Sequence, residues 1–168
     1  MSLSMYQASV PVFQKTLGNL KTILKKGEEH CAAKKIDPSV MLNSRLFPDM
    51  FALTRQVQIA ADVAKGACCR LAGKEVVSFE DKETTFADLY ARIDRTLELV
   101  NAAKAAEIDG SEGRDITIKP GGREMTFKGQ TYLLNWVMPN FFFHVTTTYA
   151  ILRHNGVEIG KMDFLGEF

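Results

Sequence analysis

The chain has 168 residues, of which 46% are hydrophobic and 24% charged, and its formal net charge is +1. These values exclude a disordered chain and predict one globular domain over residues 1–168. The near-neutral charge, with no basic stripe along the sequence, argues against a nucleic-acid partner.

The sequence also argues against a membrane location. Charged residues interrupt every apolar stretch before it reaches membrane-spanning length. The first five residues, MSLSM, lack the positive region and apolar core of a signal peptide. Cys31, Cys68 and Cys69 have no zinc or redox spacing, which favours small buried thiols in a reducing compartment. We therefore expect a cytoplasmic protein.

Apolar periodicity predicts the first two long helices. Over residues 4–34, four apolar side chains recur at helical steps: Phe13, Leu17, Leu20 and Leu24. Asp37-Pro38 is typical of a cap followed by the first residue of a short helix. The second long helix is predicted to begin at Phe47-Pro48-Asp49 and to end at Gly73. Its apolar stripe comprises Met50, Leu53, Val57, Ala60, Ala64, Ala67 and Leu71.

After a linker over residues 75–83, Thr85 and Asp88 predict a capping box for a third helix that reaches Val100. A loop is expected over residues 105–114, and alternating apolar residues on both sides of Pro120-Gly121-Gly122 predict a small β-hairpin. The last helix is predicted over residues 131–154, with a kink at Pro139. The apolar tail to Phe168 is expected to pack against the helices.

Four amphipathic helices must bury their apolar stripes against one another. The predicted fold is therefore all-α, an up-and-down four-helix bundle with a small β-hairpin before the last helix.

The candidate site centres on the last helix, where helical spacing places His144, Thr148 and Asn155 on one face. Asp49 and Gln56 are seven residues apart and share a face of the second helix if that helix is regular. One interpretation is a pocket lined by these five residues. The structural alternative is that the hydroxyl bonds a carbonyl one turn back, His144 bonds another helix and Asp49 caps its own.

Other polar residues give weaker signals. His144 and His154 are ten residues apart, about 80° around and about 15 Å along a regular helix, so they cannot form a metal pair by themselves. Either histidine could still join ligands from other helices. Arg55 and Asp62 form another seven-residue pair, which is either solvated or paired across helices.

Three runs of sequence carry a resemblance to a known family: LFPDMFALTRQVQIAADVAKG, EDKETTFADLYARI and PNFFFHVTTTYAILRHNGVEIGKMDFLG. They resemble an uncharacterised bacterial branch of the DinB/YfiT-like superfamily that is labelled a domain of unknown function. The resemblance implies a DinB-like four-helix bundle, commonly a homodimer, among proteins described as metal-dependent enzymes.

The resemblance also implies a ligand set that this sequence does not supply. Metal-binding relatives typically present one histidine on the second helix and a His-x-x-x-His pair just before an Arg-Gly-Gln-like helix end. Aligning that end with Asn155-Gly156 puts His154 at the second position of the pair and Ala150, which cannot bind metal, at the first. The second helix offers Gln56 or Asp49 instead of histidine.

Three functions remain open. The leading hypothesis is a bundle without a bound metal or other cofactor that binds a small molecule in a cleft near His144, Gln56 and Thr148. The second is an enzyme, of transferase or hydrolase type, that uses a divalent metal such as zinc, nickel or iron on an atypical set: His144 or His154 with Asp49 or Gln56. The third is a protein-interaction module without a ligand pocket.

Overall fold

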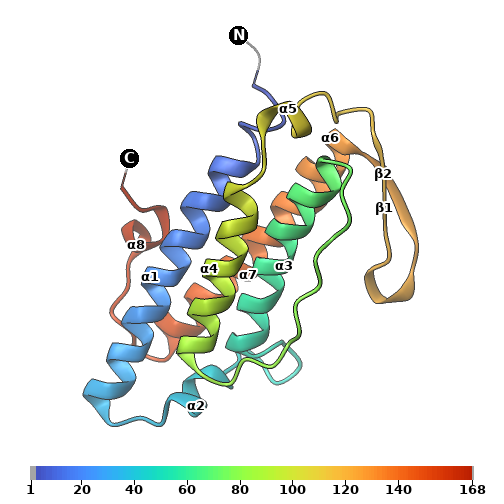
Figure 1. The fold of residues 1–168 in the computed structure, drawn as a ribbon. Coiled ribbons are helices and arrows are strands. Elements are labelled where there is room, and N and C mark those ends of the chain that lie inside the picture. The colour runs from blue at the N-terminus through green and yellow to red at the C-terminus, as the bar shows by residue number, and fades with distance from the viewer. Residues whose placement is uncertain (1–2, 168) are drawn as a thin grey trace.

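The computed structural model describes residues 3–167. Four long helices lie side by side in it (Figure 1): α1 (Val10–Lys34), α3 (Leu53–Leu71), α4 (Phe86–Asn101) and α7 (Met138–His154). The shorter helices are α2 (Pro38–Leu42), α5 (Ala105–Ile108), α6 (Gly129–Thr131) and α8 (Lys161–Leu165). The strands β1 (Asp115–Ile118) and β2 (Met125–Lys128) form an antiparallel hairpin in which Ile116 pairs with Phe127. The predicted bundle with a hairpin before its last helix is confirmed.

The predicted apolar stripes form the core of the bundle. All four stripe residues of α1 and every predicted stripe residue of α3 from Leu53 onward are fully buried. The most extensive helix contacts are those of α3 with α7, α3 with α4 and α1 with α4. Local periodicity was a sufficient guide here because burial against neighbours selects one face of each helix.

The order of the helices departs from strict alternation at one connection. Residues 72–85, which we call the crossover segment, run back along α3 to its beginning, so that α3 and α4 point the same way (Figure 1). An extended segment of this length reaches about 46 Å, whereas the 19 residues of α3 span about 28 Å. The connection is therefore long enough to return the chain to the other end of the bundle.

Caps define several helix ends as predicted. The backbone N–H of Asp88 donates to Thr85 Oγ1 at 3.1 Å, and the N–H of Thr85 donates to Asp88 Oδ2 at 2.9 Å. At α2, the N–H of Ser39 donates to Asp37 Oδ1 at 2.8 Å. The predicted loop over residues 105–114 contains the short helix α5.

The predicted start of the second long helix is wrong by about one turn. Residues 43–52 fold into turns, and α3 begins at Leu53, whose N–H donates to the carbonyl of Ser44 at 3.0 Å. Thr54 Oγ1 likewise donates to the carbonyl of Leu42 at 3.1 Å. Because these long-range bonds set the first residue of α3, Asp49 lies in an exposed turn ahead of the helix and not on its surface.

The last helical region contains the predicted irregularity at Pro139. A π-helical segment, Tyr132–Val137, stands between α6 and α7, and Pro139 occupies the first turn of α7. Proline lacks an N–H and its ring clashes with the carbonyl one turn back, so a wider turn ahead of it relieves both problems. Farther on, α8 packs on α1, where Asn19 Nδ2 donates to the carbonyl of Phe164 at 3.0 Å. The predicted packing of the tail is thus confirmed as far as the described residues go; Met1, Ser2 and Phe168, part of the predicted domain, lie outside them.

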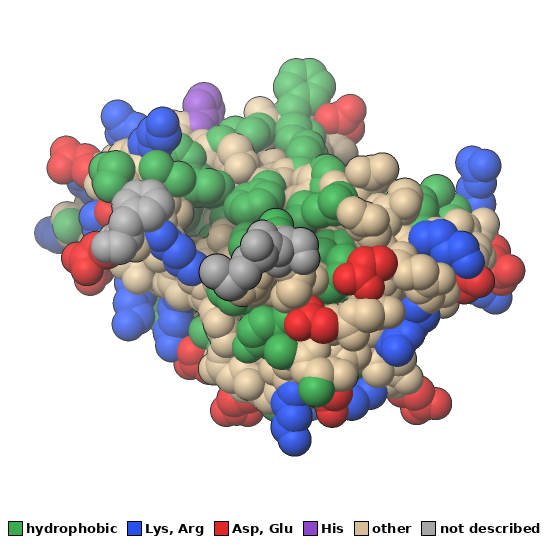
Figure 2. Space-filling view, turned by 90° about the horizontal axis from the view of Figure 1, so that it is seen from above, with side chains coloured by type: hydrophobic (Ala, Val, Ile, Leu, Met, Phe, Trp, Pro, Cys, Tyr) green, Lys and Arg blue, Asp and Glu red, His purple; other side chains and the backbone are tan. Residues whose placement is uncertain are grey.

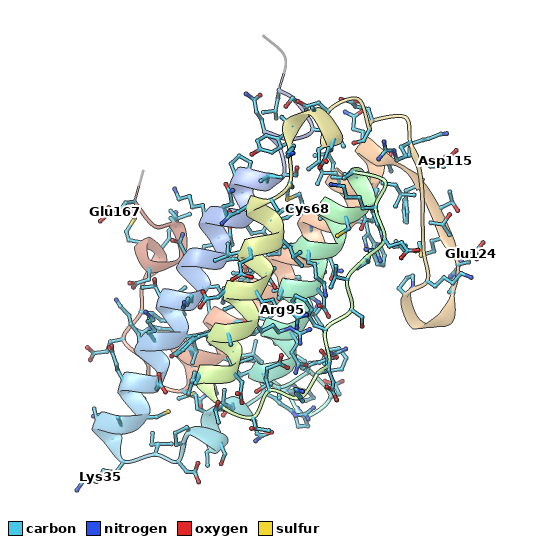
Figure 3. The ribbon with its side chains drawn as sticks, in the orientation of Figure 1. Lys35, Cys68, Arg95, Asp115, Glu124 and Glu167 are labelled. Carbon is cyan, nitrogen blue, oxygen red and sulfur yellow. The ribbon has the colours of Figure 1, made fainter. Side chains whose placement is uncertain are left out.

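Lys35 marks the far tip of α1, and Asp115 and Glu124 lie along the hairpin (Figure 3). The end of the bundle near the N-terminus has hydrophobic side chains near its centre, with Lys and Arg interspersed among Asp and Glu around the rim (Figure 2). No helix of residues 3–167 is both long and apolar enough to cross a membrane.

A close backbone approach fixes the end of the hairpin and gives a first testable expectation. A Cβ added at Gly129 would lie 2.0 Å from the carbonyl oxygen of Ser111, which belongs to backbone and cannot swing aside. Gly129→Ala should therefore lower the free energy of unfolding by about 1–3 kcal/mol through overpacking. Gly18→Ala is the matched control, because a Cβ there meets nothing within 4 Å; it should stabilise α1 by about 0.5–1 kcal/mol. Urea unfolding measures both, and equal effects of the two variants would contradict the assigned contact.

Candidate functional site

A chain of hydrogen bonds joins α7 to the beginning of α3 through a buried histidine. His144 Nδ1 lies 2.6 Å from Gln56 Oε1, and Gln56 Nε2 donates to the carbonyl of Phe51 at 3.0 Å. A carbonyl can only accept, so the Phe51 contact identifies the amide nitrogen of Gln56 and turns its oxygen toward His144. His144 Nδ1 must then carry the proton, which leaves Nε2 as an unprotonated acceptor. We call His144 and Gln56 the His144 pair.

Burial keeps this histidine neutral. His144 is 7% exposed and Gln56 is 1% exposed. Desolvation, with a smaller effect from the positive charge of Arg55, lowers the pKa of His144 from 6.5 to about 4. Near pH 7 the imidazole is therefore a neutral hydrogen-bond acceptor and a weak base.

The acceptor atom of this pair is free. Among the described residues His144 Nε2 has no hydrogen-bond partner, yet it is not one of the fully enclosed polar atoms that lack one. It therefore keeps some contact with solvent. One exposed aromatic side chain lies close to the pair: Phe143, whose ring centroid is 5.2 Å from that of His144. Phe51, whose carbonyl ends the chain of bonds, is also exposed.

The other predicted site residues divide into one near the pair and three outside it. Thr148 is fully buried, and its Oγ1 donates to the carbonyl of His144 at 2.9 Å, the bond that the structural alternative predicted. His154 and Asn155 are exposed at the end of α7, and Asn155 Nδ2 donates to the carbonyl of Ile151 at 2.8 Å. No hydrogen bond or ion pair joins Asp49 to the pair, and its predicted place on the helix beside Gln56 is wrong.

These donors do not fit a divalent metal. Both the oxygen and the nitrogen of the Gln56 amide are hydrogen-bonded within the protein, and the Thr148 hydroxyl donates its proton to a carbonyl. His144 Nε2 is therefore the one good metal ligand that remains. A zinc site needs three or four converging donors. Within residues 3–167 no three His, Cys, Asp or Glu side chains come together in a way that could hold a metal ion.

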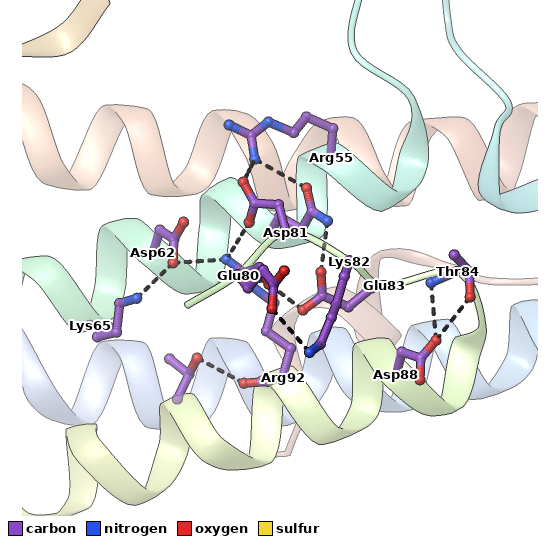
Figure 4. A network of polar contacts seen from close by, with 12 residues as sticks. Arg55, Asp62, Lys65, Glu80, Asp81, Lys82, Glu83, Thr84, Asp88 and Arg92 are labelled. Atoms are coloured by element: carbon purple, nitrogen blue, oxygen red, sulfur yellow. Dashed lines mark hydrogen bonds and ion pairs between the residues drawn. The ribbon is translucent and has the colours of Figure 1, made fainter. Parts of the chain in front are cut away.

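A second polar cluster, which sequence reasoning missed, lies where the crossover segment passes over α3 and α4 (Figure 4). At its centre is Arg92 of α4, 3% exposed, surrounded by carboxylates of α3 and of the crossover segment. Its Nη1 donates to Glu83 Oε1 at 2.8 Å, and its Nη2 lies 3.0 Å from Asp62 Oδ1 and 2.9 Å from Asp81 Oδ1. We call this cluster, with Lys65, Arg55 and Gln58, the Arg92 network.

The contacts of Arg92 have short distances, but not all of them have good hydrogen-bond angles. The Nη2 contacts are short enough for ion pairing, but neither Nη2 nor Nε has a hydrogen bond of good geometry. Burial alone lowers the pKa of Arg92, and the hydrogen bond that Arg92 donates to Glu83, together with the charges of Glu83 and the nearby aspartates, more than reverses that effect. Arg92 is therefore a buried cation that depends on its carboxylate partners.

The remaining members tie the crossover segment to α3. Lys65, 2% exposed, pairs with Asp62 at 2.9 Å and lies 3.7 Å from the centre of the Phe79 ring. Arg55 pairs with Asp81 of the crossover segment, whereas Asp62 pairs with Arg92 of another helix, so the predicted pairing across helices holds for Asp62 alone. Charged residues at the edge of an apolar helical stripe, followed by the acidic run EDKE, were the available signal for this network.

The predicted burial of the cysteines is confirmed for Cys31 and Cys68 and only in part for Cys69. Cys31 and Cys68 are buried, Cys69 is partly buried, and all three are free thiols. Burial, first among its causes, raises the pKa of Cys68 to about 12. A thiol of this kind is not a nucleophile near neutral pH.

Comparison with known proteins agrees with the fold. Residues 5–165 match the family described as Domain of unknown function (DUF1993). A similar solved structure is that of a DinB family member protein from Shewanella denitrificans, with 41% sequence identity and a TM-score of 0.89, over 97% of this chain and 92% of that one. No curated protein matches the chain. The chain therefore belongs to the DUF1993 family and has a DinB-like helical fold.

Proposed function

We propose that this DinB-like bundle binds a small molecule between α3 and α7, beside His144, without using a metal. The observation that carries the proposal is the chain of bonds from the Phe51 carbonyl through Gln56 to His144, which leaves Nε2 as a neutral acceptor with access to solvent. A ligand that covers Nε2 displaces the solvent there, so a ligand with a donor keeps the acceptor paired, whereas one without a donor leaves it buried and unpaired at a cost in free energy.

The surroundings narrow the chemistry of the ligand. Phe143 is 55% exposed and offers apolar surface next to the imidazole. The nearby charge of Arg55 disfavours a cation, since it already opposes protonation of His144. The proposed ligand is therefore not a cation, and it combines an O–H or N–H donor with an apolar or aromatic part.

The low pKa of His144 favours binding over proton transfer. A general base works best when its pKa is near the working pH. With a pKa of about 4, His144 holds a donor in place far better than it removes a proton.

Phenol is a suitable probe because it combines one O–H donor with an aromatic ring. Added to the full chain, it should shift the backbone amide resonances of residues around His144 and Gln56 and saturate with a dissociation constant in about the millimolar range. Anisole, which has the same ring without the donor, should bind at least about tenfold more weakly, as expected when a buried acceptor stays unpaired.

Two variants separate this site from general surface binding. His144→Gln should lose phenol binding, whereas His154→Gln makes the same chemical change at an exposed position and should retain it. Phenol binding that is unaffected by His144→Gln would refute the proposal. So would stoichiometric zinc, nickel or iron in protein purified without a histidine tag, if His144→Gln removed that metal; this result would establish the metal-enzyme alternative.

Other expectations from the sequence stay predictions. They are the single domain over residues 1–168, the homodimer and the cytoplasmic location. An interaction module would gain support if Phe51 and Phe143 were covered by a second copy of the chain.

A further inference from the structure

A hollow of about 250 Å³ lies between α3, the hairpin and the π-helical segment. α3 contributes Asp62 and Arg70, the hairpin contributes Lys119, and the π-helical segment contributes Tyr132 and Trp136. None of the residues that line it belongs to the His144 pair, so this hollow is independent of the function proposed above.

Aromatic side chains hold one wall of the hollow in place. The ring of Phe127, on β2, lies 6.4 Å from that of Tyr132 and 6.0 Å from that of Trp136. Tyr132 and Trp136 both belong to the π-helical segment ahead of Pro139, so this segment carries both rings to the hairpin. The Trp136 ring thus lines the hollow from a segment that is packed on the hairpin.

Arg70 of α3 supplies hydrogen-bond donors to the hollow. One of its terminal nitrogens, Nη1, donates to Tyr132 Oη at 3.2 Å, and its other N–H groups have no partner within residues 3–167. Gly66 makes room for this guanidinium, since a Cβ at that position would lie 2.5 Å from Arg70 Nη1.

Tyr132 brings a second donor to the same place. The residue is 2% exposed, and burial raises the pKa of its phenol, so the hydroxyl stays protonated. Its oxygen accepts from Arg70, while its own proton has no acceptor among the described residues. Two converging donors of this kind are the arrangement that holds a carboxylate.

The remaining charges leave the hollow free to accept an anion. Asp62 Oδ1 forms ion pairs with Lys65 Nζ at 2.9 Å and with Arg92 Nη2 at 3.0 Å, so the charge of Asp62 is balanced within the Arg92 network. Lys119 and Glu124 pair with each other at 2.9 Å on the exposed hairpin. Arg70 is therefore the cation that decides which ligand the hollow favours.

We propose that this hollow binds a small aromatic carboxylate, with the carboxylate on Arg70 and Tyr132 Oη and the ring against Trp136. The hollow accommodates a single ring with a short acidic group. Its apolar wall gives contact area, and the charge-assisted bonds give orientation.

Trp136 is the only tryptophan of the chain, so its indole N–H gives a single resonance that reports directly on this site. Benzoate should shift that resonance and saturate with a dissociation constant in about the millimolar range or below. Benzyl alcohol, without the charge, and acetate, without the ring, should each bind at least about tenfold more weakly.

Variants test the assigned contacts. Arg70→Gln should weaken benzoate binding at least tenfold, whereas Arg123→Gln removes an equal charge from the exposed hairpin and should change it less than twofold. Tyr132→Phe keeps the ring and removes the second donor, so it tests the site even if Arg70→Gln fails to fold; it should also weaken binding. A Trp136 resonance that benzoate does not shift, or equal binding by the wild type and Tyr132→Phe, overturns the proposal.

Discussion

Replacing Arg92 by methionine should lower the free energy of unfolding by about 3–5 kcal/mol, the cost of breaking a buried ion pair from one side. Methionine fills similar space but leaves Glu83, the most buried of the three carboxylates at 10% exposure, without its cation. The loss should fall toward the lower end of that range because Asp62 and Asp81 are more than a third exposed and keep Lys65 and Arg55 as partners.

Two further variants show whether the loss comes from the network. Arg95→Met, one turn farther along α4, removes an exposed cation that lies 4.1 Å from the centre of the Phe79 ring, and should cost less than about 1 kcal/mol. Glu83→Gln combined with Arg92→Met should recover part of the stability, since it removes the carboxylate left unpaired. Urea unfolding measures all three. If Arg92→Met were no more costly than Arg95→Met, the network would not be holding the crossover segment.

Acidification should destabilise the wild type through His144 by up to about 3 kcal/mol between pH 6.5 and pH 4. In the unfolded chain this histidine binds a proton near its ordinary pKa of 6.5, whereas in the folded protein burial lowers the pKa to about 4. Between these values the unfolded state binds more protons, so the free energy of unfolding falls as the pH falls. The stabilising contribution is complete above pH 6.5 and is lost below pH 4.

His144→Gln isolates this contribution from the carboxylates that also titrate in acid. The variant should be less stable than the wild type at pH 7, and the difference should shrink by about 3 kcal/mol by pH 4, because glutamine takes up no proton. His154→Gln is the control at an exposed position and should follow the wild type throughout. Parallel pH profiles for His144→Gln and the wild type would contradict the buried neutral histidine.

Much of the fold could be predicted because its signals are local. The stripe of Phe13, Leu17, Leu20 and Leu24, the capping box at Thr85 and the alternation around Pro120 each depend on residues a few positions apart. Burial and backbone hydrogen bonding impose those spacings on any chain that forms these elements.

What could not be predicted depends on contacts between distant residues. The start of α3 is set by the carbonyls of Leu42 and Ser44, which no helical period can reveal. The same is true of the direction of α4, because a polar linker of given length can turn back or cross over.

The candidate site shows the same division. His144 and Gln56, both named from helical faces, do meet, but their bond joins residues 88 positions apart, and its consequence for the tautomer requires the Phe51 carbonyl as well. The burial of Arg92 could not be predicted from the sequence, because an arginine beside an apolar stripe is usually solvated. Only the acidic crossover segment, returning over α4, makes its burial possible.

The protonation state of His144 is the most direct test of this account. Nitrogen-15 NMR of the imidazole, followed from pH 8 to pH 3.5, distinguishes a protonated from an unprotonated nitrogen at each position. The account predicts a proton on Nδ1, an unprotonated Nε2 near neutral pH and titration near pH 4. A proton on Nε2, or titration near the ordinary value of 6.5, would contradict it.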